Sequence, residues 1–345
     1  MNSRVGKASI TLAHGSGGKA MRDLIENVIV KSFDNPALTP LEDQARFDLK
    51  ELTCRGDRLA FTTDSYVVDP LFFPGGDIGT LSVNGTINDL AMGGAVPLYL
   101  SCGFILEEGL PIETLRQVTE SMKQEAEKSQ VSIVTGDTKV VPRGAADKMF
   151  VNTAGIGVIP KEVDIASTRA KPGDLVILNG FIGDHGAAIL IARGDLSLES
   201  SVESDCQSLS RLVQAMLKVC PDIHCLRDAT RGGVATVLNE FAQSSGVCIK
   251  MDETKIPIRD EVRGVCEILG LDPLYLANEG ILLAIVPRDC AEQVVETMRF
   301  LPEGQNSMII GEVVEAPAKR VVMKTSFGGE RIVDMMVGEQ LPRIC

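Results

Sequence analysis

The first half of the chain alternates runs that favour β-strands with runs in which apolar side chains recur at helical spacing. In 111–128 the apolar residues Leu115, Val118 and Met122 are three and four positions apart, as on one face of an amphipathic helix. Other stretches, such as 59–68, hold the Val, Phe, Tyr and Thr typical of strands. The pattern predicts strands over 59–68, 98–106, 131–135 and 150–159, and helices over 79–92 and 111–128.

The second half repeats this alternation after the segment 161–172, which is rich in charged and turn-forming residues and is the best candidate for a domain boundary. No short repeat and no low-complexity tract interrupts it. The mixture indicates an α/β unit with mixed strand pairing. The pattern predicts strands over 173–180, 282–286 and 308–314. It also predicts helices that begin at 183–186 and at 228–233, and a further helix over 291–300.

Length and charge narrow the class of protein. With 345 residues the chain is long enough for two domains. Its net charge of −13 argues against nucleic acid as a partner, and a polyphosphate ligand would have to arrive with a cation. No run approaches the ~20 apolar residues of a membrane span and no apolar leader follows a basic start, so we expect a cytoplasmic protein without a membrane partner.

The nine cysteines form no CxxC pair. We therefore expect eight of them to be reduced and mostly buried, as small hydrophobic residues in a reducing compartment. The ninth, Cys345, ends the chain on an arm, 338–345, in which Gly338 is the expected hinge and Pro342 prevents a helix. Eight extended residues reach about 25 Å, enough to cross an active-site cleft. A frayed end with no role is the alternative. We expect the terminal carboxylate to raise the pKa of the Cys345 thiol and Arg343 to oppose it.

A glycine-rich segment near the N-terminus precedes a helix. Residues 12–19 read Leu-Ala-His-Gly-Ser-Gly-Gly-Lys, and helical spacing follows. Free backbone N–H groups at the start of a helix suit phosphate oxygens, so this segment is a candidate phosphate lid. It is not a Walker A loop, because Ala13 and Ala20 stand where Gly and Ser or Thr are needed. A simple flexible lead-in to the helix is an equal alternative.

Charged residues at the ends of predicted elements are candidates for chemistry. Carboxylates that converge from different segments suit Mg²⁺, with phosphate oxygens as further ligands. Lys139, which follows Gly-Asp-Thr after a predicted strand, would face the γ-phosphate, and Glu279 precedes the strand at 282–286. Taken singly, each could equally be a helix cap or a surface charge. The predicted metal ligands are Asp64, Asp89, Asp137 and Asp228.

These motifs together resemble a known family. The segments 62–65, 85–97, 135–139 and 227–233, with Asp43, resemble the ATP-binding superfamily that contains aminoimidazole ribonucleotide synthetase and selenophosphate synthetase. With the segments 12–18 and 277–280 and the terminal Pro-Arg-Ile-Cys, the resemblance narrows to the carbamoyl dehydratases of hydrogenase maturation and covers nearly the whole chain. Selenophosphate synthetase is disfavoured because its reactive residue sits in the N-terminal loop, where this chain has His14, Gly15 and Ser16.

The resemblance implies an α+β protein with an aminoimidazole-ribonucleotide-synthetase-like fold. Its N-terminal mixed sheets would pair in a homodimer as a barrel-like core around the ATP sites, with an α/β C-terminal domain and a flexible tail. It also implies the carbamoyltransferase HypF as donor and the HypC–HypD complex as acceptor of cyanide. The expected parts are a lid and helix over 1–40, an ATP-binding and dimerisation domain over 41–160, an α/β domain over 161–337 and a mobile tail over 338–345.

The implied reaction is ATP-dependent dehydration of a carbamoyl group on Cys345 to a thiocyanate, with Mg²⁺ as cofactor and Glu279 and Lys139 as catalytic partners. Two alternatives stay open: a non-catalytic carrier of a modified cysteine, and a small-molecule ATP-dependent synthetase with the same fold. The expected ATP contacts are His14, Gly15, Gly17, Gly18, Asp43, Asp64, Asp89, Asp137 and Thr138.

Overall fold

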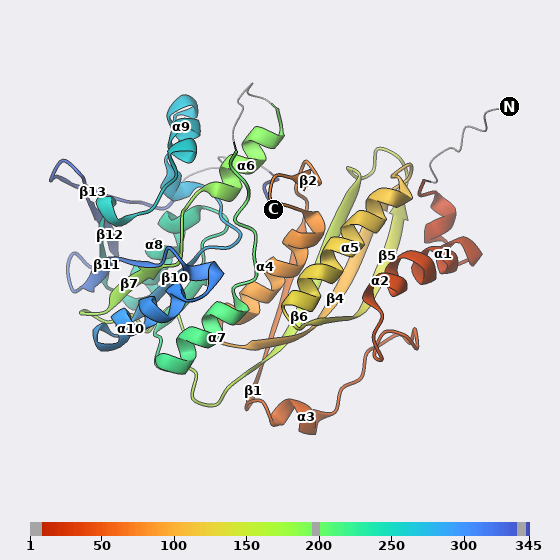
Figure 1. Cartoon of the computed structure of the whole chain (residues 1–345), viewed down its shortest axis with the longest axis horizontal. Helices are drawn as coiled ribbons and strands as arrows, with labels where there is room; N and C mark the ends of the chain where they lie inside the picture. Colours follow the sequence, from red (N-terminus) through yellow and green to blue (C-terminus); the bar gives the residue numbers. More distant parts are fainter. Residues whose placement is uncertain (1–8, 195–200, 337–342) are drawn as a thin grey trace.

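The computed structural model describes residues 9–194, 201–336 and 343–345. Two main sheets lie in the two halves of the molecule, with helices packed on both (Figure 1). The N-terminal half supplies one sheet and residues beyond 174 supply the other. This arrangement confirms the predicted α+β class. None of the helices in the described ranges is both long enough and apolar enough to cross a membrane.

The N-terminal sheet has four strands in the order β1-β6-β4-β5. The pairs β1–β6 and β4–β6 are antiparallel, and β4–β5 is parallel because the helix α5 connects these two strands. Helices α4 and α5 cover one face of this sheet (Figure 1). The bounds are β1 (Arg58–Tyr66), α4 (Ile78–Met92), β4 (Val96–Glu107), α5 (Ile112–Lys128), β5 (Ser132–Val141) and β6 (Met149–Ile159), with a small hairpin of β2 (Phe72–Phe73) and β3 (Gly76–Asp77).

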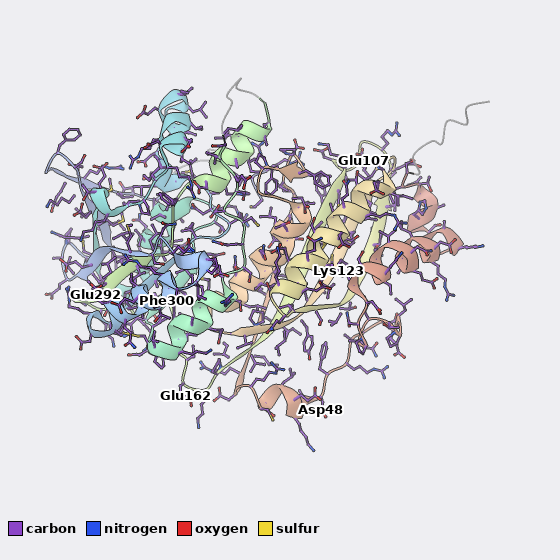
Figure 2. The ribbon with its side chains drawn as sticks, in the orientation of Figure 1. Asp48, Glu107, Lys123, Glu162, Glu292 and Phe300 are labelled. Carbon is purple, nitrogen blue, oxygen red and sulfur yellow. A yellow bond between two sulfur atoms is a disulfide. The ribbon has the colours of Figure 1, made fainter. Side chains whose placement is uncertain are left out.

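The two helices differ in burial for a reason visible in the sequence. Helix α5 buries Leu115, Val118 and Met122 on one stripe and turns Lys123 outward (Figure 2). Helix α4 is buried nearly all round, since it lies between the N-terminal sheet and the elements α7 and β8 of the second half. Its small and polar residues are therefore interior residues, and Asp89 among them faces the space between the halves.

The residues before β1 form short helical pieces, of which η1 and α2 contact the edge strand β5. Leu24, Val28 and Phe33 pack into the N-terminal core, and Asp48 caps α3 by accepting the N–H of Lys50 at 2.8 Å (Figure 2). The bounds are η1 (Leu12–Gly15), α1 (Lys19–Leu24), the π-helical turn η2 (Ile25–Val30), α2 (Lys31–Phe33) and α3 (Leu49–Thr53).

The C-terminal sheet has seven strands in the order β13-β12-β9-β11-β7-β10-β8, of which only β12 and β9 pair in parallel. Strand β10 is completely buried because helices cover both faces. Its residues Leu283 and Ile285 pack toward α8, and the alternate residues Leu282, Ala284 and Val286 pack toward α7 and α10. The strands are β7 (Leu175–Leu178), β8 (Cys225–Asp228), β9 (Cys248–Asp252), β10 (Leu282–Val286), β11 (Met308–Val314), β12 (Arg320–Lys324) and β13 (Glu330–Ile332).

Helices and short turns complete this half. Phe300, the residue after α10, is 88% exposed (Figure 2). The helices are α6 (Asp184–Ala192), α7 (Ser210–Val219), α8 (Gly233–Ser245), α9 (Asp260–Leu269) and α10 (Arg288–Arg299), with the 3₁₀ turns η3 (Glu253–Lys255), η4 (Pro273–Tyr275) and η5 (Pro302–Gly304).

The structure confirms the elements predicted from the sequence and corrects three details. Strand β5 continues to Val141, so Lys139 lies inside a strand and not after one. The elements that were not predicted are the helices α3, α7 and α9 and the strands β2, β3, β8, β9, β12 and β13. Cys220, at the end of α7, and Cys290, in α10, are joined by a disulfide, which contradicts the expectation that both are reduced.

Candidate functional site

A cavity of about 610 Å³ lies between the two halves of the molecule. Its walls come from the end of β1, from α4, from the loop after β8 and from the loop before β10, so elements of both sheets are needed to form it. The last residue of the chain lines it as well. The lining residues with candidate chemistry are Asp64, Tyr66, Asp89, Asp228, Arg231, Glu279 and Cys345.

Three of the predicted aspartates meet at this cavity. Thr62 Oγ1 donates a hydrogen bond to Asp89 Oδ2 at 2.7 Å and holds that carboxylate against β1. Burial raises the pKa of Asp89 to about 6; the hydrogen bond from Thr62 opposes this shift, and the charge of Asp64 adds to it. Burial and the charge of Asp89 raise the pKa of Asp228 to about 7. The charge of Arg227 opposes both shifts without cancelling them, so the carboxyl groups gather an excess of negative charge at this cavity.

This excess charge fits a hard cation. Carboxylate oxygens are the donors that Mg²⁺ prefers, and a cation among Asp64, Asp89 and Asp228 would relieve their mutual repulsion. Within the described ranges, no three His, Cys, Asp or Glu side chains form a ready-made metal cluster. The donor set thus suits a cation that takes its remaining ligands from phosphate or water, as Mg²⁺ does with nucleotides.

Asp137 does not line this cavity, so a single chain does not bring the predicted set of four aspartates together. Side chains that lie in register across a sheet point to one face, and the next residue along each strand points to the other. Asp137 is one residue beyond the row that contains Asp64, so the two carboxylates leave the sheet on opposite faces. The row consists of Asp64, Thr153, Cys102 and Gly136, each in register with the next.

Lys139 shares the face of Asp137. Its Nζ lies 2.7 Å from Asp137 Oδ2, and both side chains are more than half exposed. This ion pair and the backbone N–H of Thr138, which also binds Asp137, lower the pKa of the Asp137 carboxyl. Lys139 does not line the cavity of Cys345, so a single chain does not bring it to the thiol.

The N-terminal glycine-rich segment lines a different space. A second cavity, of about 730 Å³, lies between α1, η2 and β5, and Gly17, Gly18, Asp137 and Thr138 are among its walls. His14 is bonded locally, with its Nδ1 accepting the N–H of Thr11 at 2.9 Å. Gly15 packs on Val140, where a Cβ would lie 2.9 Å from the Val140 backbone nitrogen. Asp43 is exposed and lines neither cavity.

Glu279 is buried, in contrast to a surface glutamate. Its Oε1 has no hydrogen-bond partner among the described residues. Burial, with Asp205, Asp228 and Asp64 as further causes, raises its pKa well above the ordinary value. Asp205 fixes the loop, since its Oδ2 accepts the N–H groups of Glu279 at 3.1 Å and Gly280 at 2.9 Å. Glu279 is part of the cavity wall, and its predicted catalytic role stays a prediction.

The end of the chain is docked on the molecule. An oxygen of the terminal carboxylate of Cys345 accepts the N–H of Val67 at 3.1 Å, and the carbonyl of Arg343 accepts the N–H of Asp69 at 3.3 Å. Ile344 is buried in the N-terminal core. Residues 343–345 are therefore part of a wall, which corrects the expectation that the whole arm is free. Gly338 and Pro342, the predicted hinge and stiffener, lie outside the described residues.

The environment of the Cys345 thiol also differs from the prediction. Burial, followed by Glu279, raises its pKa to about 12, and Arg231 opposes this shift. Arg343 was expected to lower it, but its guanidinium turns to Asp147, with Nη1 and Oδ2 2.6 Å apart. The thiol is thus held neutral in a site surrounded by carboxylates.

Four residues of the site were not predicted as functional: Tyr66, His185, Asp205 and Arg231. His185 and Arg231 belong to the sequences 183–186 and 228–233 that predicted helix starts, so the signal was present but was interpreted as structural. Asp205 lies in a segment without periodicity and gave no signal. Tyr66 was hidden in the strand at 59–68, where an aromatic residue is expected from β-propensity alone.

Two family models match the chain: the AIR synthase related protein N-terminal domain over residues 42–159 and the C-terminal domain of the same family over 171–324. The fold and the cavity between these two domains define the chain as a two-domain member of the AIR synthase related family.

Closer relatives define the family further. The chain is 56% identical to the carbamoyl dehydratase HypE of Rhodobacter capsulatus, over 97% of this chain and 98% of that protein. A crystal structure described as hydrogenase maturation protein HypE in complex with ATP superimposes with a TM-score of 0.92 at 51% identity, covering 97% of this chain and 99% of that one. A structure of a HypE–HypF complex matches with a TM-score of 0.79 at 44% identity, covering 91% of this chain and 99% of that one. The chain belongs to the HypE family of carbamoyl dehydratases.

Proposed function

We propose that this protein is an ATP-dependent carbamoyl dehydratase that converts a carbamoyl group on its own Cys345 into a thiocyanate for hydrogenase maturation. One observation carries the proposal. The terminal thiol lines the same cavity as the carboxylates of Asp64, Asp89 and Asp228 and the buried Glu279. A carrier that only displays its thiol to other proteins has no need to enclose it among these groups.

The first half of the reaction makes the carbamoyl oxygen a leaving group. In S–C(=O)–NH₂ that oxygen attacks the γ-phosphorus of ATP, a new O–P bond forms, the bond to the β-phosphate oxygen breaks and ADP leaves. One N–H proton is lost as the C=N bond forms. Arg231, at the cavity wall, would offset the negative charge that develops on the transferred phosphoryl group.

The second half forms the triple bond. A base removes the remaining N–H proton, the C–O bond breaks with its electrons going to phosphate, and S–C≡N remains on the cysteine. Carbamoyl and ATP thus become thiocyanate, ADP, phosphate and one net proton. Glu279 suits the role of base because its Oε1 is unpartnered and a carboxylate with a raised pKa is a stronger base. Burial of the site protects the phosphorylated intermediate from hydrolysis.

Asp64, Asp89 and Asp228 are the residues that would hold Mg²⁺. When bound, the cation supplies charge neutralisation for the phosphates of ATP. Without it these three carboxylates repel the nucleotide, so we expect ATP binding to the acidic cavity to require a divalent cation.

We also propose a homodimer through the exposed face of the N-terminal sheet. That face presents Leu59 and Phe61, which are 60% and 72% exposed, together with Asp137 and Lys139. Pairing of two such faces would explain why Lys139 and the glycine-rich segment, His14 to Gly18, lie apart from the thiol of their own chain. A mixture of Lys139→Ala and Cys345→Ala chains should then recover about a quarter of the parent activity, because half of the dimers regain one site. No recovery after proven subunit exchange would reject the composite site.

The partners follow from the same chemistry and from the relatives. A carbamoyltransferase of the HypF type would charge Cys345, and a HypC–HypD complex would accept the cyanide. The solved HypE–HypF complex supports the first of these. We propose a cytoplasmic location, where ATP and these partners are available.

Intact mass of the carbamoylated protein tests the reaction directly. Addition of Mg-ATP should lower the mass by one water, about 18 Da, as carbamoyl becomes cyano. Cys345→Ala should bind ATP and accept no carbamoyl group. Glu279→Gln should accept it and convert it about 10²–10⁴-fold more slowly. A cyanide-releasing adduct on Cys345→Ala would show that the terminal thiol is not the carrier.

A further inference from the structure

His185 contacts the tail at its most deeply buried point. The residue is the second of α6 and is entirely buried. Its Nε2 lies 2.8 Å from the carbonyl oxygen of Ile344, the residue that precedes the reactive cysteine. It also lies 4.0 Å from Glu279 Oε1. The imidazole therefore stands between the tail and the proposed base.

The partners of the ring determine which nitrogen carries the proton. A carbonyl oxygen can only accept, so Nε2 is the donor toward Ile344. Nδ1 is then the acceptor for the hydroxyl of Ser204, 2.8 Å away. Ser204 Oγ in turn accepts the N–H of Cys206 at 3.1 Å, which leaves its own hydrogen free for the imidazole. Burial lowers the pKa of His185 to about 4, in agreement with a neutral ring with one fixed hydrogen.

The rest of the structure orients this ring independently of the tail. The N–H of His185 donates to Asp205 Oδ1 at 3.1 Å, and the same carboxylate holds the loop of Glu279. The edge of the ring meets Phe73, with ring centres 5.6 Å apart and planes at 86°. Asp205 thus couples the position of the imidazole to the position of the base, and the imidazole fixes the tail between them.

The other contacts of the tail are less enclosed. Arg193 Nη2 donates to the carbonyl of Arg343 at 2.8 Å, and Asp147, which is 40% exposed, binds the Arg343 guanidinium. The ion pair is open to water, since both of its side chains are more than a third exposed, and it can be exchanged for bonds to water at little cost. The hydrogen bond from His185 cannot be exchanged for a bond to water in this way, because the carbonyl of buried Ile344 would be left unpaired.

We propose that His185 is the positioning residue that latches the terminal thiol in the dehydration site. The proposal rests on the proposed function, in which the tail must leave to be charged and must dock to be dehydrated. A latch changes these two steps in opposite directions. Loss of the latch exposes Cys345 to the carbamoyl donor and to alkylating reagents. The same loss slows conversion of the carbamoyl group, because this group then spends less time at Glu279. A merely structural residue would not produce this pair of effects.

The test compares His185→Leu, which removes the donor, with His185→Gln, whose side-chain N–H can reach the same carbonyl. Alkylation of Cys345 by iodoacetamide should be about tenfold faster in the Leu variant, the change expected for one buried hydrogen bond, and the Gln variant should restore part of the protection. Single-turnover loss of water from the carbamoylated Leu variant, followed by intact mass with Mg-ATP, should be slower by a similar factor.

His224→Leu is the matched control. His224 is also a buried imidazole, and its Nδ1 lies 2.7 Å from Asp174 Oδ2. Among the described residues its hydrogen bonds go to Asp174, Ala166 and Ile285, and none goes to residues 343–345. Its loss should leave the alkylation rate of Cys345 unchanged. Should His185→Leu fail to fold, Ser204→Ala decides the question, because loss of the hydroxyl frees Nδ1 to take the proton and should speed alkylation in the same direction.

An unchanged alkylation rate in the folded Leu variant, or in Ser204→Ala if only that variant folds, overturns the latch. So does equal acceleration in His224→Leu. Alkylation does not depend on ATP chemistry, so these outcomes are distinct from failure of the proposed function, which would appear as a parent protein that loses no water with Mg-ATP.

Discussion

Gly280 is the position at which the candidate site is most sensitive to a small change. A Cβ at this residue would lie 1.9 Å from the backbone carbonyl oxygen of Asp205 and 2.6 Å from Gln207 Cγ. The first neighbour is backbone and cannot rotate away. Gly280→Ala must therefore push apart the loop before β10 and the segment at 205–207, which Asp205 otherwise joins through its bonds to Glu279 and Gly280.

The expected cost combines two effects. Overpacking of a rigid site destabilises by about 1–3 kcal/mol. Each N–H that loses its bond to Asp205 adds about 1 kcal/mol, so Gly280→Ala should lower the free energy of unfolding by about 2–4 kcal/mol. Because Glu279 moves with the loop, dehydration of the carbamoylated protein should slow by at least about 10²-fold, the cost typical of a 1 Å misplacement.

Urea denaturation and the mass-based dehydration assay measure these two quantities. Gly264→Ala is the matched control, since Gly264 lies in α9 and a Cβ there meets no atom within 4 Å. Replacement of a helical glycine by alanine should stabilise the protein by about 0.5–1 kcal/mol and leave activity unchanged. If Gly280→Ala unfolds at the same urea concentration as the parent, the close approach to Asp205 does not exist in solution and the reasoning fails.

Two further predictions concern charge. Asp89→Asn should raise the free energy of unfolding by about 1 kcal/mol at pH 7 in the absence of divalent cations, because it removes repulsion with Asp64 and Asp228. The same variant should lose ATP turnover. A variant that is less stable than the parent in the presence of a chelator would contradict this reasoning. For His185 the pKa is about 4 in the folded protein against 6.5 for the free group, so the unfolded chain binds more protons between these values. The stability that the neutral ring contributes is therefore complete above pH 6.5 and declines as pH falls toward 4, by about 3 kcal/mol at most. In urea titrations His185→Gln should show a weaker decline of the free energy of unfolding over this pH range.

The sequence by itself determined the strongly periodic elements and part of the list of reactive groups. The helical spacing of Leu115, Val118 and Met122 was sufficient for α5, since one buried stripe requires that period. The strands in the first half were likewise predicted from their runs of β-branched and aromatic residues, which need no knowledge of the neighbouring strands. The motifs around Asp64, Asp89, Asp228 and Glu279 and the terminal cysteine named the chemistry through their resemblance to a known family. Taken singly, each of these residues left a structural role open.

Only the tertiary structure decided which of these groups meet. Asp64 and Asp137 belong to the same sheet, and their separation depends on the register of β1, β6, β4 and β5, which sets one row of side chains on each face. Registers of this kind come from contacts between residues far apart in the chain, so no local pattern reveals them. The docking of Ile344 and Cys345 on Val67 and His185 joins residues more than 150 positions apart for the same reason. The sequence therefore identifies the candidate reactive cysteine, and only the tertiary structure shows the site on which it docks.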